Sequence, residues 1–364
     1  MVGFYALLIV YASLYPFTGW RNQGIVPWAY LWAPWPKYWT GFDFLVNVAG
    51  YAPFGFLLAL ALMRRRSTRF AVALASLVAI LLSFTMESVQ SYMPARVASN
   101  VDFSLNSIGG ILGATIAWIC QSLGLPQRWS AARSRWFVPG SRVILVLLAL
   151  WLVGLLFPTS VAFGMGQVFE QLEADVLQLL ADTPFLDWLP LRKFELQPLL
   201  PLTEAAAVAL GALAPCLLGC MASARRRHKI VLVLLILAAG TGISALSTAL
   251  AWGPKYGWVW VTAPVMVGWP LALLGALLLA ALSLPRRVYA LLLVAALLLQ
   301  LFWLNGASQS PYFATTLQSW EQGQFVNFYG LTRWINAGWP YAVIVFAVQR
   351  ALRQSNWRFS KIDA

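Results

Sequence analysis

Residues 43–50 read DFLVNVAG, and residues 102–109 read DFSLNSIG. Both stretches fit the pattern D-F-x-x-N-x-x-G, in which the acid and the amide lie four residues apart and therefore on one face of a helix. Each stretch begins a run of apolar residues that is long enough to cross a membrane. We interpret the two copies as a duplicated helical hairpin within the first four helices of the chain.

The composition around the two copies is typical of a membrane protein. Apolar residues make up 60% of the 364 residues and charged residues only 10%, whereas soluble chains have roughly 45–50% and 25%. The net charge of +13 would suggest nucleic acid binding in a soluble protein. Here the basic residues form short clusters between long uncharged runs, which is the pattern of a polytopic membrane protein. We therefore predict membrane lipids as partners and no binding of nucleic acid.

Ten runs of the chain lack Asp, Glu, Lys and Arg, and each of them predicts a membrane-spanning helix. The runs cover residues 1–20, 44–63, 70–86, 103–127, 143–169, 205–224, 230–254, 256–285, 288–320 and 334–349. The predicted fold class is therefore all-α, a polytopic helical membrane protein with about ten transmembrane helices. We interpret the first run as a retained helix, because no convincing small-residue cleavage site follows it.

The distribution of basic residues predicts the orientation of the chain. Most Lys and Arg residues follow the second, fourth, sixth, eighth and tenth runs. Because loops rich in Lys and Arg stay in the cytoplasm, we predict that both termini are cytoplasmic. The acidic residues then lie almost entirely on the outer side, or in the outer half of the membrane.

We predict three parts in the chain. Residues 1–122 form a four-helix membrane domain of two hairpin repeats, residues 123–142 a basic cytoplasmic linker, and residues 143–364 a six-helix membrane domain. Within the last part, the outer segment 160–200 contains apolar residues at helical spacing opposite acidic ones. This amphipathic helix could lie on the outer leaflet or pack as a cap over the bundle. The Trp-rich segment 20–41 could likewise anchor the chain at the interface or stack on sugars.

Polar residues of the second, third and fourth predicted spans fall at one depth near the outer surface. They form the candidate ligand-binding set, together with one Arg of the connecting loop: Asp43, Asn47, Glu87, Gln90, Arg96, Asp102 and Asn106. An ionisable group within a span usually faces a polar cavity or a partner, and Glu87 is such a group. Structural alternatives exist for the others, because Asp at a helix start often caps the helix and Asn can bond between helices. Gly109-x3-Gly113 predicts close helix packing.

We predict no metal site and no cofactor. The three cysteines, Cys120, Cys216 and Cys220, all lie within apolar runs, where they are expected to act as small helix residues. The chain contains a single histidine, His228, which cannot complete a usual zinc set with them.

The first third of the chain carries a spaced pattern that goes beyond the two copies. Its residues follow the order Asp43-x3-Asn47-x3-Tyr51-x-Pro53-x-Gly55 and then Glu87-x2-Gln90-x3-Pro94-x-Arg96-x5-Asp102-x3-Asn106-x2-Gly109-Gly110-x2-Gly113. Over about residues 1–122, this order resembles the VanZ-like family of bacterial membrane proteins, and the chain looks like a long variety with extra C-terminal spans. The resemblance implies residence in the bacterial cytoplasmic (inner) membrane and a role in the cell envelope. The founding member is associated with low-level teicoplanin resistance, and other members resemble accessory proteins of envelope polysaccharide loci.

Three functions remain open from the sequence. In the first, an outer-facing polar intramembrane pocket binds a lipid-linked envelope or polysaccharide precursor, or acts in glycopeptide antibiotic resistance. In the second, the protein is an intramembrane enzyme that uses Glu87 as its candidate catalytic acid or base, with Asp43 or Asp102, on a lipid head group. The third is a flippase for a lipid-linked precursor. The six later spans could serve as a docking module for a membrane protein partner.

Overall fold

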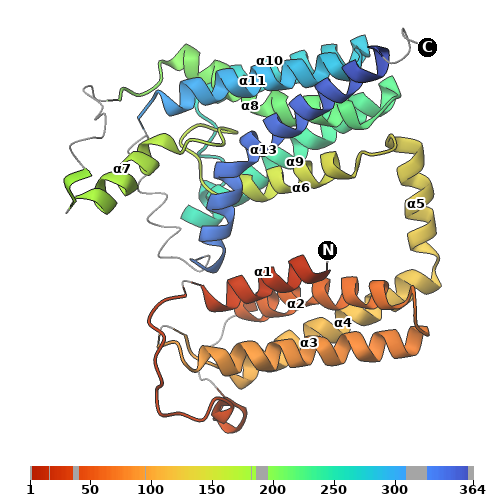
Figure 1. Ribbon diagram of the computed structural model, residues 1–364, viewed down its shortest axis with the longest axis vertical. Helices are drawn as coiled ribbons and strands as arrows, with labels where there is room; N and C mark the ends of the chain where they lie inside the picture. The colour runs from red at the N-terminus through yellow and green to blue at the C-terminus, as the bar shows by residue number, and fades with distance from the viewer. Residues whose placement is uncertain are drawn as a thin grey trace. The chain divides into compact units, whose positions relative to one another are not determined.

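The computed structural model describes residues 2–15, 17–35, 41–94, 96–181, 183–185, 196–308 and 326–359 (Figure 1). Within these ranges the regular elements are helices, and no strand is found, which confirms the predicted all-α fold class. The chain divides into two compact units, Met1–Ala132 and Arg133–Ala364. The division falls within helix α5 (Leu125–Trp136).

Ten helices occupy the positions of the ten predicted spans. In the described part of the chain, seven of them are long and apolar enough to cross a membrane: α2 (Gly41–Leu62), α3 (Thr68–Gln90), α4 (Asn100–Ser122), α8 (Pro201–Ala222), α9 (Arg226–Trp252), α10 (Ala263–Leu282) and α11 (Arg286–Asn305). The other three are the shorter apolar helices α1 (Val2–Leu14) and α6 (Arg142–Leu155) and the long helix α13 (Val326–Phe359). The protein is therefore a polytopic helical membrane protein.

Helix α6 ends earlier than the sequence predicts. Its 14 residues rise about 21 Å, which is less than the roughly 30 Å of a bilayer core. Pro158 disfavours a helical conformation of the residue before it, and Phe163 and Gly166 have positive φ angles of 59° and 86°. The chain therefore continues beyond Leu155 as an irregular segment, residues 156–168, rather than as a helix.

Helix α13 is longer than the predicted run 334–349. It begins before Arg333 and continues past Arg350. The prediction ended the span at each charged residue, but a helix does not have to end there, because a long Arg side chain can carry its charge to the membrane surface. Charge-free runs therefore located this helix but underestimated its length.

In the first unit, α2 and α4 meet backbone to backbone. A Cβ atom added at Gly55, Gly109 or Gly113 would collide with a backbone carbonyl of the opposite helix. Such contact requires residues without side chains on the facing stripe, and it confirms the close packing predicted for the glycines of α4. Helix α3 packs against α4 beside this seam, where Gly110 faces Ala79.

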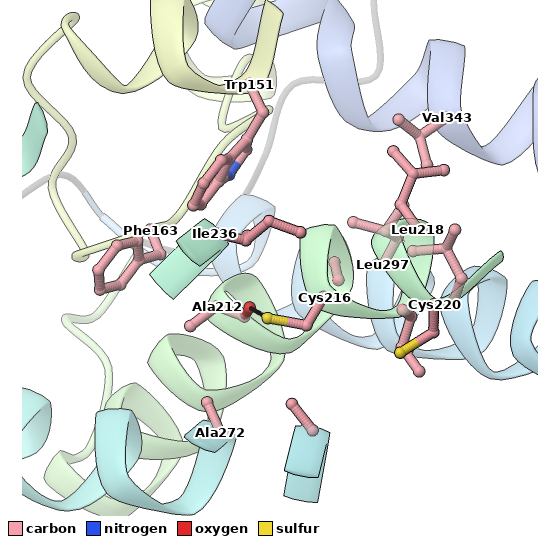
Figure 2. Close-up of a cluster of buried hydrophobic side chains, with 14 of the residues drawn as sticks. Trp151, Phe163, Ala212, Cys216, Leu218, Cys220, Ile236, Ala272, Leu297 and Val343 are labelled. Carbon is pink, nitrogen blue, oxygen red and sulfur yellow. Dashed lines mark hydrogen bonds between the residues drawn. The ribbon is translucent and has the colours of Figure 1, made fainter. Parts of the chain in front are cut away.

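In the second unit, the other helices pack around α8. Helices α6, α9, α10 and α11 all contact it, and most residues from Ala205 to Ala222 are buried. Figure 2 shows side chains of the surrounding helices around Cys216 and Leu218. The thiol of Cys216 donates to the Ala212 carbonyl of its own helix at 3.3 Å, and all three cysteines of the chain are free thiols. The core around α8 consists mainly of apolar side chains, with buried amides such as that of Gln300, which donates to the Ala207 carbonyl of α8.

Helix α7 (Phe169–Leu180) lies within the segment predicted to contain an amphipathic helix. Its apolar residues Phe169, Leu172 and Leu179 are exposed rather than packed against the unit. This exposure favours the interpretation that α7 lies on a membrane surface over the alternative of a cap packed on the bundle.

Candidate functional site

The two copies of the repeated pattern meet through a hydrogen bond between α2 and α4. The side-chain amide of Asn47 donates to Oδ1 of Asp102 at 2.7 Å. Asp102 lies in the first turn of α4, but it does not cap the helix. Ser99 is the N-cap, and its Oγ accepts hydrogen bonds from the N–H groups of Val101 and Asp102. The capping alternative for Asp102 is therefore wrong, and its carboxylate connects the two helices.

Glu87 is buried at the same end of the helices. Its side chain is 3% exposed, and Oε2 accepts a hydrogen bond from the backbone N–H of Ser99 at 2.9 Å. Ser99 therefore caps α4 with its side chain and fixes Glu87 with its backbone. The carboxylates of Glu87 and Asp102 are close enough to interact electrostatically. The carboxylates of Glu87 on α3 and Asp102 on α4 are thus brought together next to Ser99, the residue that precedes α4.

Gln90 and Arg96 bind the end of α1. The side-chain amide of Gln90 donates to the Ser13 carbonyl at 2.8 Å, and Nη2 of Arg96 donates to the Tyr15 carbonyl at 2.7 Å. The last carbonyls of a helix have no partner within it and carry partial negative charge, so both donors are well placed. Burial lowers the pKa of Arg96, because it disfavours the charged guanidinium.

The remaining predicted residues are Asn106 and Asp43. Asn106 is buried in α4, on the stripe that continues to Gly109 and Gly113 at the contact with α2. Asp43 belongs to α2, but its side chain lies outside the described residues. The structure thus brings Asn47, Glu87 and Asp102 together and buries Asn106 on the same side of α4.

Three buried hydroxyl groups near this cluster were not part of the predicted ligand-binding set. They belong to Tyr51, Ser83 and Ser88. The Tyr51 hydroxyl lies within reach of the hydroxyls of Ser83 and Ser13 and within electrostatic range of Glu87, and the Ser88 hydroxyl lies within reach of Tyr30. Helical spacing could have identified two of them, because Tyr51 follows Asn47 by four residues and Ser83 precedes Glu87 by four.

The segment between α1 and α2 covers the cluster. It contains the short 3-10 helix η1 (Ala29–Trp32), whose Tyr30 is buried with its ring edge-to-face against Phe103 at 6.3 Å. Burial raises the pKa of Tyr30, and the negative charge of Glu87 raises it further. Trp32 and Trp35 of the same segment are 76% and 72% exposed. Tyr30 therefore attaches the segment to the cluster, while the tryptophans face outward.

Residues 3–121, about a third of the chain, match the family model described as VanZ/LLP1. This range contains the whole cluster. No match was found among the curated proteins or among the solved structures.

Proposed function

We propose that this multi-pass membrane protein, which carries a VanZ-like domain in its first third, binds the polar head group of a lipid-linked envelope or polysaccharide precursor at the cluster around Glu87 and Asp102. The observation that carries the proposal is the meeting of two carboxylates, Glu87 and Asp102, with the buried hydroxyls of Tyr51, Ser83 and Ser88. Hydroxyl groups both donate and accept hydrogen bonds, as the hydroxyls of a sugar do. Polar groups of this kind within a membrane-spanning helix are costly and usually functional.

The surrounding contacts hold the two carboxylates at defined positions. The Asn47 amide and the Ser99 N–H each bind one carboxylate, and the glycine seam fixes α2 against α4. Because Glu87 and the hydroxyls are buried, the covering segment has to move aside for the head group to bind. The exposed Trp32 and Trp35 would keep the covering segment at the membrane surface, where a lipid-linked ligand is presented.

Leucine substitutions at two amides test the proposal. Asn47→Leu and Asn106→Leu should insert into the membrane normally but lose the bound precursor and the envelope phenotype. Ser104→Leu, on the exposed side of α4, is the matched control and should keep both. Native mass spectrometry of the full chain, extracted with its lipids, measures the retained species. Complementation of a deletion strain, scored by glycopeptide sensitivity, measures the phenotype. Full retention and full complementation by both Asn variants would refute the proposal.

The proximity of Glu87 and Asp102 also favours a second candidate, an intramembrane enzyme. In that case Glu87 would act as general acid or base on the head group, with Asp102 as the second carboxylate. Glu87→Gln keeps the size of the side chain but cannot exchange a proton. It should then abolish the phenotype while the precursor stays bound. An unchanged phenotype in this variant would exclude the enzyme and leave the binding function.

A further inference from the structure

The second unit contains a polar site of its own, far along the chain from the cluster of the first unit. Two adjoining cavities of about 110 and 380 Å³ share Ser160, Glu204, Val259 and Thr262 in their walls. They lie near the beginning of α8, which is the end of this helix away from the basic residues 225–229. The larger cavity has the size of a small-molecule pocket.

The irregular segment 156–168 forms one wall of the cavities and is held from several sides. The side-chain amide of Gln300 donates to the Phe163 and Ala207 carbonyls, both at 3.2 Å. The ring of Phe163 packs between Trp151 and Trp260 at centroid distances of 6.4 and 5.6 Å, and Figure 2 shows its approach to the core. Non-helical backbone within a membrane is tolerated where it is buried in protein or lines a polar cavity. The wall is therefore fixed before any ligand arrives.

Three of the hydroxyl side chains in the cavity walls, those of Ser160, Ser247 and Thr248, already donate their hydrogens within the protein. Oγ of Ser247 donates to the Leu156 carbonyl at 2.7 Å, and Oγ1 of Thr248 donates to the Ser244 carbonyl at 2.7 Å. Each hydroxyl has one hydrogen, so the lone pairs of Ser247 and Thr248 are the groups left for a ligand.

The Ser160 hydroxyl also uses its single hydrogen within the protein. The side-chain amide of Gln167 donates to the Ala307 carbonyl at 3.1 Å, which turns its Oε1 toward Ser160. The Ser160 hydroxyl must then donate to that oxygen, and it presents lone pairs to both cavities.

The charge of the cavity walls also favours a ligand that is positively charged and donates hydrogen bonds. Among the described residues that line the two cavities, Glu204 is the only charged one, and it borders both. Trp260 lines the smaller cavity, and its buried indole N–H makes no hydrogen bond to a described residue. The site therefore combines the Glu204 carboxylate, the acceptor oxygens of Ser160, Ser247 and Thr248, the Trp260 ring, and the further hydroxyl groups of Thr159, Ser244 and Thr262.

We propose that this site binds a primary ammonium group, held by the Glu204 carboxylate and by the lone pairs of Ser160, Ser247 and Thr248. An ammonium group brings a positive charge and three donors, and so complements a negative wall of acceptors. The Trp260 ring in the wall of the smaller cavity adds an aromatic surface for a cation–π contact. Ser247, Thr248 and Trp260 line the smaller cavity of about 110 Å³, so the ammonium group would lie there. The rest of an organic molecule would occupy the adjoining cavity of about 380 Å³, since a single water occupies only about 30 Å³.

The ammonium group could belong to a lipid head group or to a soluble amine, and the two sources can be separated with the purified full chain. In the lipid arm, nanodiscs contain either phosphatidylethanolamine or its N-acetylated form in a phosphatidylglycerol background. In the soluble arm, the detergent-solubilised protein is titrated with glucosamine or N-acetylglucosamine. Native mass spectrometry measures retained lipid, and the thermal unfolding midpoint measures soluble binding. Binding of the free amine but not of its acetylated form, in either arm, supports the site and identifies its source.

Two Glu variants complete the test. Glu204→Gln should weaken binding of the amine by roughly tenfold or more, because it removes a charge-assisted hydrogen bond. Glu173→Gln, which removes a carboxylate on α7 outside the cavities, should bind like the unmodified protein. Equal affinity for the amine and the acetylated form, no binding in both arms, or undiminished binding by Glu204→Gln would overturn the proposal. Acetylation is tested on the unmodified chain, so this comparison holds even if a variant does not fold.

Discussion

The two units solve the problem of helix packing in different ways. In the first, α2 and α4 touch through glycines, and polar bonds such as Asn47 to Asp102 connect them. In the second, α8 is enclosed by large apolar side chains of other helices, among them Trp151 and Leu297, although Gly211 and Gly268 also allow a close approach there. Where two backbones touch, there is no room for an added side-chain atom. Where large side chains fill a core, stability depends on the packing contacts that those side chains make. The first unit should therefore be sensitive to gained volume and the second to lost volume.

The polar sites of the two units differ as well. The first brings two carboxylates together beside the buried hydroxyls of Tyr51 and Ser83. The second has one carboxylate, and the hydroxyls of Ser247 and Thr248 in its wall already donate their hydrogens to backbone carbonyls. Hydroxyl groups with a free hydrogen suit a ligand that donates and accepts, whereas the lone pairs of Ser247 and Thr248 suit a donor. The protein thus offers two binding environments of different chemistry.

The largest effect is expected from added volume at the glycine seam. Gly55→Val would place its side chain against the Gly110 carbonyl, and we expect a loss of about 3 kcal/mol in the free energy of unfolding or a failure to fold. Gly50→Val is the matched control on the same helix, because nothing lies near a Cβ atom at that position. Thermal unfolding of the purified variants measures the difference. Equal stability of both variants would contradict a backbone-to-backbone seam.

Removed volume in the second unit should have a smaller but clear effect. Leu218 is 0% exposed and belongs to the core around α8, whereas Leu235 of α9 is 58% exposed. We expect Leu218→Ala to cost about 2 kcal/mol, near the low end for such changes, because lipid tails are as apolar as leucine and the lost contacts dominate. Leu235→Ala should stay within about 0.5 kcal/mol. Denaturant unfolding compares them, and similar values would break the proposed distinction between the units.

The smallest effect is expected from the polar bond between α2 and α4. In a double-mutant cycle, Asn47→Ala and Asp102→Ala should show a coupling free energy of about 1 kcal/mol, within the range of interhelical hydrogen bonds in membranes. Asn47→Ala combined with Ser104→Ala should be additive, because Ser104 is exposed and its hydroxyl bonds to Asn100 of its own helix. Additivity in both cycles would mean that the amide and the carboxylate do not interact.

The sequence predicted where the helices lie better than where they end. Charge-free runs located all ten helices, because a membrane-spanning segment has to be apolar. They missed the end of α6 at Leu155, since residues 156–168 are as apolar as a helix and only buried contacts such as that of Gln300 support their irregular backbone. They also shortened α13, because a helix can continue through Arg333 and Arg350.

Helical periodicity predicted those parts of the candidate site that depend on spacing within one helix. Spacing placed Asn47 and Asp102 each on a definite face of its helix and predicted the close approach of Gly109 and Gly113. Spacing could not show that Ser99 caps α4 and also binds Glu87, because a loop decides that contact. It also could not show that Tyr30 covers the cluster, since that contact joins residues far apart in the chain.

The sequence by itself determined that this chain is a bundle of apolar helices with a duplicated polar pattern, because hydrophobicity and helical spacing are local properties. Only the tertiary structure decided which polar groups bond to one another. The Ser247 hydroxyl donates to the Leu156 carbonyl, and the Tyr51 hydroxyl lies beside the hydroxyl of Ser83 on another helix. These pairings depend on the distances between separate segments, which no local pattern specifies.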